Sequence, residues 1–187
     1  HQYGTNVIFG NGADDVQVIA AAGGGAATDL GGTPPDSRYG AVIGDFFFLG
    51  ATATSRLAIK NSGRNDSAYW TAGQKDSDGQ TFPDGGDVQG VTGLETGGLV
   101  FQSDTVRRMG ARTDAAVFEF HRIDPARGTT SPYSITSDGD DVYYYSTTGF
   151  QRISGDGSIA NIGIDAVNDW FKGDCNNSRF KAVIGAL

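Results

Sequence analysis

The chain has 187 residues, a net charge of −8, 29 glycines and one cysteine. The acidic balance argues against a general role in gripping the nucleic-acid backbone, which needs clustered Lys and Arg. A lone Cys175 excludes an internal disulfide, and no apolar run reaches the roughly 18 residues of a transmembrane helix. Abundant glycine between many short apolar runs predicts an all-β chain with tight turns.

The first predicted element is a hairpin over residues 3–20, in which TNVIF and VQVIA flank the turn GNGADD. Asn11-Gly12 suits the positive φ of such a turn. Residues 20–36 are rich in small residues and end in Pro34-Pro35, so they are expected to form a connecting loop or a loop that contacts a neighbouring subunit.

Two or three strands are predicted over residues 39–60. The run Phe46 to Leu49 is apolar without alternation, as in an inner strand that is buried on both faces. Residues 56–60 alternate as an outer strand would. Residues 61–87 are polar, and Tyr69-Trp70 is expected to anchor this long loop against the sheets.

Residues 88–123 and 133–164 each hold four strand candidates. Residues 165–173 are the best helix candidate, with Asp165 as its cap and Val167, Trp170 and Phe171 on a shared face. The one basic cluster is Arg107-Arg108 with Arg112, and a solvated face is its expected place.

A two-strand phrase recurs through these elements. It reads YGAVIGDFFFLG from Tyr39, VQGVTGLETGGLVF from Val88 and YSITSDGDDVYYY from Tyr133, and a partial copy, FKAVIGAL, starts at Phe180. Val42, Val91, Ile135 and Val183 mark the copies at spacings of 49, 44 and 48 residues. This period predicts a β-propeller or part of one, with about four blade-like repeats of 44–49 residues in one region over residues 1–187.

The first and last copies of the phrase are incomplete, which leaves two interpretations. Residues 7–9 resemble the second strand of the phrase and residues 182–184 resemble the first. The two ends could complete one blade together and close a small ring. The second interpretation, a window on a longer propeller, is favoured because a four-bladed ring is at the low end of the known range.

Catalytic and metal-binding patterns are weak in this sequence. No G-x-S-x-G elbow or P-loop is present, and residues 76–82 do not fit the Asp-box of sialidase-like propellers. Five scattered arginines offer no obvious grip for a carboxylate: Arg38, Arg56, Arg64, Arg107 and Arg152. The acidic turns at residues 14–15, 76–78 and 138–141 could bind calcium, although hairpin turns favour Asp and Gly for conformational reasons alone. His121 is expected at the surface, and neither enzyme activity nor a cofactor or metal is predicted.

Residues 64–187, about two-thirds of the chain, carry several phrases whose order is informative. These phrases are Tyr69-Trp70-Thr71, Phe82 to Gly86 (FPDGG), Gly98 to Gln102 (GLVFQ), Val106 to Met109 (VRRM), VYYYSTTGFQRI from Val142 and DAVNDWF from Asp165. In this order they resemble a family of phage structural proteins, the tail hub or nozzle of short-tailed phages, which is associated with stabilising packaged DNA. Two departures are Ala68-Tyr69, where the family usually has a second acidic or proline residue, and the greater length of family members.

The resemblance implies a propeller located in the virion tail or neck, assembled as a homo-oligomeric ring with other tail or neck proteins. DNA would pass nearby without sequence-specific binding, and no catalytic residue is implied. The long polar loops at residues 20–36 and 61–87 are the expected subunit contacts. The candidate contact residues are Pro34, Pro35, Tyr69, Trp70, Phe82 and Pro83.

Two other functions remain open from the sequence. A carbohydrate-binding propeller, lectin-like or an inactive sialidase relative, would stack Trp70 or Trp170 on sugars. A propeller enzyme would need carboxylates or arginines that converge on a pocket at the propeller axis.

Overall fold

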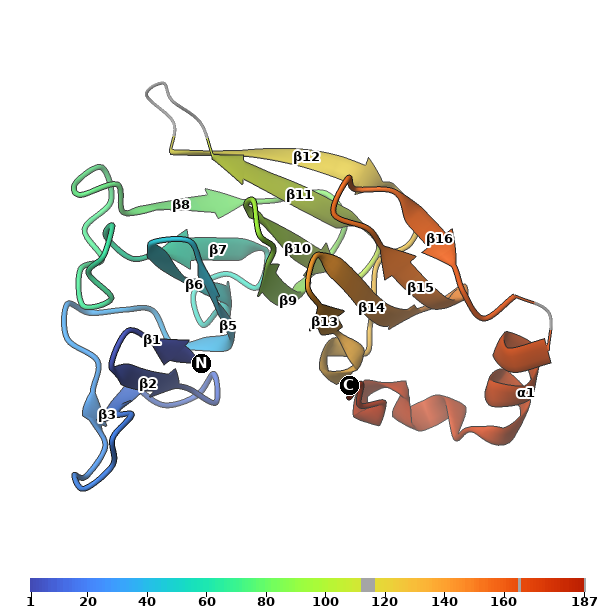
Figure 1. Ribbon diagram of the computed structural model, residues 1–187, viewed down its shortest axis with the longest axis horizontal. Helices are drawn as coiled ribbons and strands as arrows, with labels where there is room; N and C mark the ends of the chain where they lie inside the picture. The colour runs from blue at the N-terminus through green and yellow to red at the C-terminus, as the bar shows by residue number, and fades with distance from the viewer. Residues whose placement is uncertain (112–116, 165, 187) are drawn as a thin grey trace.

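The computed structural model describes residues 1–111, 117–164 and 166–186. Within them, four antiparallel sheets of four strands each succeed one another along the chain, so the prediction of an all-β fold is confirmed. Figure 1 shows the sheets side by side along an arc, with β8, β12 and β16 on its outer side. In every sheet the spatial order of the strands is their chain order. Direct antiparallel connections between successive strands, mostly short but long between β7 and β8, produce this up-and-down pattern.

The first two sheets occupy residues 2–81. The first contains β1 (Gln2–Tyr3), β2 (Asn6–Phe9), β3 (Gln17–Ala20) and β4 (Thr28–Asp29). The second contains β5 (Ser37–Ile43), β6 (Phe46–Thr52), β7 (Ala58–Asn61) and β8 (Asp78–Thr81).

The last two sheets and the helical elements follow. The third sheet contains β9 (Val88–Gly93), β10 (Gly98–Gln102), β11 (Val106–Ala111) and β12 (Phe118–Asp124). The fourth contains β13 (Thr136–Asp138), β14 (Asp141–Ser146), β15 (Gly149–Ile153) and β16 (Ile159–Asn161). The 3-10 turns η1 (Pro132–Ser134) and η2 (Asn177–Ala182) and the helix α1 (Ala166–Asp174) complete the described elements.

Several predicted elements are in place. The hairpin over residues 3–20 is confirmed, because β2 and β3 pair with Val7 opposite Ile19. The four strands expected in residues 88–123 and the four expected in residues 133–164 are also present. Each of the two long loops contains one short strand, β4 or β8, that completes its sheet. The predicted outer strand at residues 56–60 is therefore wrong, because β7 is the third strand and β8 lies outside it.

The partial copy of the phrase at the end of the chain does not form a strand. Residues 177–182 form η2, and the Phe180 ring packs 5.4 Å from the ring of Tyr145. Ser131 Oγ also donates a hydrogen bond to the Phe180 carbonyl at 2.6 Å. The first sheet already has its four strands, so the interpretation in which the two chain ends complete one blade is wrong.

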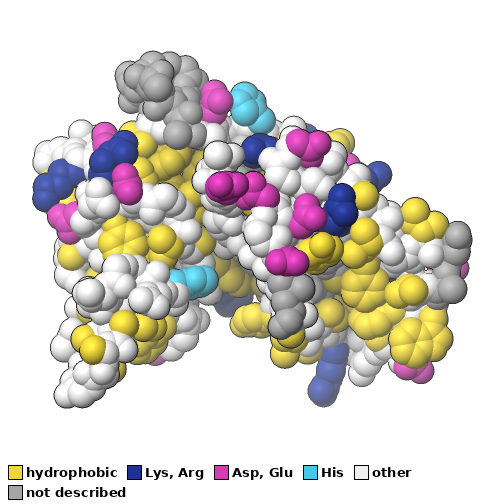
Figure 2. Space-filling view, in the orientation of Figure 1, with side chains coloured by type: hydrophobic (Ala, Val, Ile, Leu, Met, Phe, Trp, Pro, Cys, Tyr) yellow, Lys and Arg dark blue, Asp and Glu magenta, His cyan; other side chains and the backbone are white. Residues whose placement is uncertain are grey.

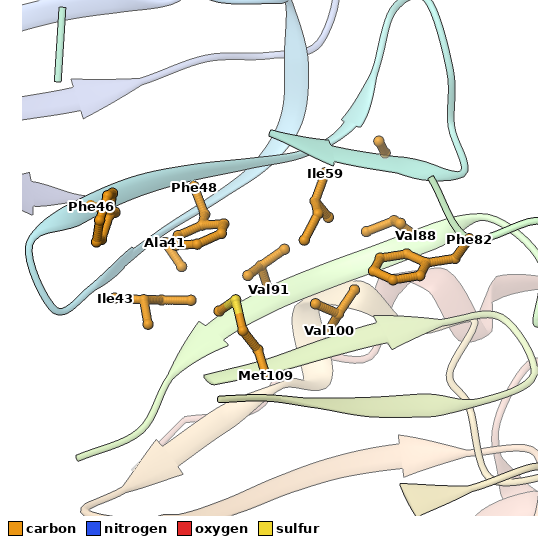
Figure 3. Packing of buried hydrophobic residues seen from close by; sticks show 11 residues of the cluster. Ala41, Ile43, Phe46, Phe48, Ile59, Phe82, Val88, Val91, Val100 and Met109 are labelled. Atoms are coloured by element: carbon orange, nitrogen blue, oxygen red, sulfur yellow. The ribbon is translucent and has the colours of Figure 1, made fainter. Parts of the chain in front are cut away.

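Apolar clusters join each sheet to the next. One cluster lies between the first and second sheets, another between the second and third, and another between the third and fourth. Figure 3 shows the middle cluster, in which Phe46, Phe48 and Ile59 face Val91, Val100 and Met109. Each such buried side chain contributes about 1.5–3 kcal/mol of burial free energy. The sheets are therefore packed face to face in chain order.

The position of β6 between two apolar clusters explains why its sequence does not alternate between apolar and polar residues. Phe47 and Leu49 point into the cluster shared with the first sheet. Phe46 and Phe48 point into the cluster shared with the third sheet. Since successive side chains of a strand face opposite sides, a strand between two apolar layers needs apolar residues at both parities. The prediction of an inner strand buried on both faces is confirmed.

The C-terminal segment covers the free face of the fourth sheet. The Phe171 ring of α1 lies 5.1 Å from the ring of Tyr145 and 5.0 Å from that of Phe150. The predicted helix is confirmed. The prediction that Val167, Trp170 and Phe171 share one apolar face is wrong, because Phe171 packs inward while Val167 and Trp170 are exposed. Asp165, the expected cap, lies outside the described residues.

Candidate functional site

The turn at residues 82–86 is held by two buried side chains of the third sheet. Arg107 Nη2 lies 2.6 Å from Asp84 Oδ1, and its guanidinium stacks 4.8 Å from the centroid of the Phe82 ring. Gln102 Nε2 donates to the carbonyls of Asp84, at 2.9 Å, and Gly86, at 2.7 Å. Gln102 Oε1 in turn accepts from Arg107 Nε at 2.7 Å. We call this set, Phe82 to Gly86 with Gln102 and Arg107, the turn clamp.

The prediction that the basic cluster lies on a solvated face is wrong for Arg107, which is only 8% exposed. Burial lowers the pKa of its guanidinium below the ordinary value, yet the group stays cationic at neutral pH. The carboxylate of Asp84 also pairs with Arg122. Arg108 donates to the Gly155 carbonyl of the fourth sheet, and Arg112 lies outside the described residues.

The turn clamp brings together phrases that are separate in the sequence. The FPDGG phrase supplies the turn, the GLVFQ phrase ends in Gln102, and the VRRM phrase contains Arg107. Gly85 has a φ of +92°, and a Cβ there would overlap the Thr105 side chain. Each phrase therefore has a structural task at one site, the connection between the second and third sheets.

The loop that precedes the clamp is held by its own charged side chains. Arg64 Nε lies 2.8 Å from Asp76 Oδ2, and Lys75 Nζ lies 3.0 Å from Asp66 Oδ2. Lys75 also sits 4.4 Å from the centroid of the Tyr69 ring. Exposed pairs of this kind contribute at most about 1 kcal/mol each, so together they order the loop more than they stabilise the fold.

The two long loops contact each other. Leu30, from the first loop, and Trp70, from the second, belong to the same buried cluster. Gly32 has a φ of +80° and approaches the Ala68 carbonyl so closely that a Cβ would overlap it. Trp70 Nε1 donates to the Ser67 carbonyl at 2.9 Å, which fixes the indole beneath the loop. The expected role of Trp70 as an anchor is thus confirmed.

The six predicted contact residues fall into two groups. Trp70 and Phe82 are buried within the chain, at 3% and 4% exposure, and support the loops from beneath. Pro34, Pro35 and Tyr69 are half-buried, and Pro83 is exposed. Subunit contact through these loops stays a prediction. The prediction that Trp70 stacks on a sugar is wrong for this conformation, because its ring is inside.

A cavity of about 520 Å³ lies on the inner side of the arc, where the second and third sheets meet the connection after β2 and the two 3-10 turns. Its walls come from the connection after β2, from β5 and β6, from β9, and from η1 and η2. The lining residues are Gly10, Asn11, Arg38, Tyr39, Ala51, Arg56, Asp87, Val88, Gln89, Pro132, Tyr133 and Lys181. Figure 2 shows the surface hollowed between the two ends of the arc, with Lys or Arg side chains at the hollow. We call this space the central cavity.

Electrostatics at the central cavity are cationic. Arg38, Arg56 and Lys181 line it, and Asp87 is the one carboxylate among its lining residues. Burial, and secondly Tyr133, raises the pKa of the Tyr39 phenol, while Arg38 and Arg56 oppose this shift. The five arginines are scattered in the sequence, but the structure brings Arg38 and Arg56 to one cavity.

Other candidate chemistry remains dispersed in the described residues. His121 is exposed, as predicted, with its Nε2 3.4 Å from Glu119 Oε1. Across residues 1–111, 117–164 and 166–186, no three His, Cys, Asp or Glu side chains gather as a metal site would require. The same residues include no helix that is long and apolar enough to cross a membrane.

The central cavity was missed by sequence reasoning for a physical reason. Its cations lie on β5, on the connection after β6 and on η2, and only the packing of the sheets brings them together. On β5, Arg38 is exposed between buried Ser37 and half-buried Tyr39. The sequence around Arg38 carries no signal that would place Arg56 or Lys181 beside it.

Comparisons with known proteins do not assign a family. No family model matches the chain, and no curated protein matches it in sequence. The resemblance to phage tail hub proteins therefore stays an expectation from the phrases themselves.

Proposed function

We propose that the chain is a structural protein of a phage virion, a subunit of a tail hub, nozzle or head–tail neck built as a β-propeller. The observation that carries this proposal is the face-to-face series of four four-stranded sheets. Radial repetition of such sheets around a central channel is what defines a propeller. The arc in Figure 1, with the central cavity on its inner side, fits four blades of that arrangement.

The turn clamp supports the family resemblance. Three phrases that carry the resemblance meet there through Asp84, Gln102 and Arg107. These contacts give the order of the three phrases a structural reason, because together they attach the turn after the second sheet to the third sheet.

Assembly with neighbours is supported by the free face of the first sheet. Val7 and Ile19 pair across β2 and β3 on the face opposite the buried Ile8, and Phe9 lies on the same face as Val7. Phe9 is 47% exposed. Closure of the arc, by further sheets of the polypeptide or by a neighbouring subunit, would bury this apolar face. The long loops at residues 20–36 and 61–87 would then meet other tail or neck proteins.

The net charge suits a wall along the DNA exit path. A surface with −8 charge repels the phosphate backbone at short range, so DNA can slide past without sequence-specific binding. In this proposal the protein acts in the virion tail or neck as a homo-oligomeric ring and catalyses no reaction.

A carbohydrate-binding propeller is the second candidate. Trp170 on α1 is 67% exposed, and Figure 2 shows hydrophobic side chains gathered near the C-terminal helix. Such a ring could stack on a sugar face. Binding on a glycan array that Trp170→Ala abolishes would favour this function, and an array without hits would reject it.

Sedimentation equilibrium of the chain over a wide concentration range tests the assembly. We expect mass to increase with concentration toward a closed oligomer, and Phe9→Ser to weaken the association at least about tenfold, since it removes an apolar contact. Trp170→Ser is the matched control on the other apolar surface. A monomer at every concentration would contradict the proposal.

A further inference from the structure

The central cavity has the size and the wall of a ligand site. Its volume of about 520 Å³ lies within the range of small-molecule sites. Segments of the second and third sheets, the connection after β2 and the two 3-10 turns contribute to it, so its shape depends on parts of the chain that are far apart in the sequence. This property distinguishes it from a groove within one loop.

Its positive charge is not balanced by the protein. Arg56 Nη1 lies 3.8 Å from Asp87 Oδ2, at the edge of ion-pair range. Arg38 and Lys181 form no ion pair with a carboxylate in the part of the chain that the structure describes. Three cations thus share one cavity with one carboxylate, in a chain that carries −8 overall. All three cations are exposed to solvent. A bound anion would therefore reach them directly and accept charge-assisted hydrogen bonds from them.

Hydrogen-bond donors accompany the cations. The phenol of Tyr39 is close enough to Arg38, Arg56 and Tyr133 for all of them to influence its pKa, which is raised. Tyr39 is consequently a neutral O–H donor at neutral pH. Tyr133 lines the same cavity with its ring 65% exposed. Guanidinium groups beside phenol donors are suited to carboxylate and phosphate oxygens, which accept several hydrogen bonds at once.

We propose that the central cavity binds a small multivalent oxyanion, a molecule with two or more carboxylate or phosphate groups, through Arg38, Arg56 and Lys181. The two arginines supply planar donor pairs, and Lys181 supplies a point charge. A cavity of about 520 Å³ accepts such a molecule whole. A nucleic-acid strand is disfavoured as occupant, because the remaining acidic surface repels a long polyanion.

Binding would also join the C-terminal segment to the sheets. Lys181 lies on η2, where the Phe180 carbonyl accepts a hydrogen bond from Ser131 Oγ at 2.6 Å. Just after η2, the Gly185 N–H donates to the Tyr133 carbonyl of η1 at 2.9 Å. Arg38 and Arg56 lie on and after the inner strands of the second sheet. An anion held by both sets bridges the second sheet and the C-terminal segment. The proposal does not depend on a role in a virion.

Calorimetric titration at low ionic strength tests this site, because screening by salt weakens exposed charges. The probes are citrate, pyrophosphate, acetate and a short single-stranded DNA. We expect citrate or pyrophosphate to bind with one site per chain and acetate to bind at least about tenfold more weakly, since it cannot engage all three cations. Comparison of citrate with pyrophosphate distinguishes carboxylate from phosphate ligands.

Charge-removing variants locate the binding. Arg38→Gln and Lys181→Gln should each weaken the affinity at least about tenfold. Lys172→Gln on α1, outside the cavity, is the matched control and should leave the affinity within about twofold. Far-ultraviolet circular dichroism confirms that each variant is folded. Absence of binding by citrate and pyrophosphate, equal weakening by Lys172→Gln, or tighter binding of the DNA would each overturn the proposal.

Discussion

Arg107 Nη2 lies 2.6 Å from Asp84 Oδ1, and this pair connects the third sheet to the turn that follows the second. Arg107 is buried, while the side chain of Asp84 is 51% exposed. Gln102 completes the unit by bonding to both the turn and the guanidinium. Stability of the inter-sheet connection therefore depends on a charge held at the edge of the core.

Replacement of the Arg107 guanidinium by an apolar group should destabilise the fold. Arg107→Met keeps the apolar stem but leaves Gln102 Oε1 without its donor, so we expect the free energy of unfolding to fall by about 1–3 kcal/mol. Arg56→Met is the matched control, because its ion pair is exposed and should contribute less than about 1 kcal/mol. Urea unfolding measures both. Equal losses in the two variants would show that the turn clamp adds nothing.

The backbone of the same turn gives a second prediction. Gly85→Ala places a side chain at a φ of +92° and against Thr105, so unfolding free energy should fall by about 1–3 kcal/mol. Gly25→Ala serves as control, because no atom lies within 4 Å of a Cβ there. That variant should stay within about 0.5 kcal/mol of the parent chain. An unchanged midpoint for Gly85→Ala would contradict the turn geometry.

The two tryptophans should behave oppositely. Trp70 is buried between the long loops and the first two sheets, so Trp70→Ala should cost about 3–5 kcal/mol. Trp170 is exposed on α1, and Trp170→Ala should change stability by less than about 0.5 kcal/mol. Thermal unfolding followed by circular dichroism compares them. A larger loss for Trp170 would mean that α1 packs differently.

Attachment of the C-terminal segment depends on Asn168. Its Oδ1 accepts from the Phe150 N–H at 3.0 Å, and its Nδ2 donates to Asn161 Oδ1 at 2.9 Å. Asn168→Ala should lower the free energy of local opening of this segment by about 1–3 kcal/mol, because the strand amide of Phe150 loses its acceptor. Hydrogen exchange should then accelerate in residues 166–182 and not in β9 to β11. Val167→Ala, on the exposed face of α1, is the control and should leave both regions protected.

Alkaline pH should weaken the fold through Tyr144. Burial is the main cause that raises the pKa of this phenol above the ordinary 10.0, and the hydroxyl donates to the Arg127 carbonyl at 2.7 Å. Because the folded-state pKa is raised, the phenol's contribution is fully present below about pH 10 and is lost as the pH rises above that value. Tyr144→Phe should lower the free energy of unfolding by about 1 kcal/mol at neutral pH. The variant should also lose less of that free energy than the parent chain as the pH rises. Stability curves from pH 7 to 12 that stay parallel for the two proteins would contradict this.

The sequence predicted the inner strands of the sheets better than their short outer strands. The recurring phrase identified the first two strands of three sheets, because apolar runs and Gly/Asp turns are local signals. The short outer strands β4 and β8 were missed, because Thr28–Asp29 and Asp78–Thr81 carry no apolar alternation. Ala182 to Ile184 resembled a strand, but η2 ends at Ala182 with the Phe180 ring packed on Tyr145, and residues 183–184 form no strand.

The site was less predictable than the fold. Trp70 could be expected as an anchor, because it was an isolated aromatic in a polar loop. The burial of Arg107 could not, since its partners Gln102 and Asp84 become neighbours only when the third sheet packs beside the turn. Convergence of Arg38, Arg56 and Lys181 likewise depends on the fold, which brings η2 to the same cavity as β5 and the connection after β6.

Electron cryo-microscopy of the native assembly that contains this chain tests the proposed function most directly. We expect a ring of copies around an axial path, with the outward face of β2 and β3 covered and residues 20–36 and 61–87 against neighbouring subunits. A chain found as an isolated monomer, with no ring and no tail or neck neighbours, would contradict the proposal.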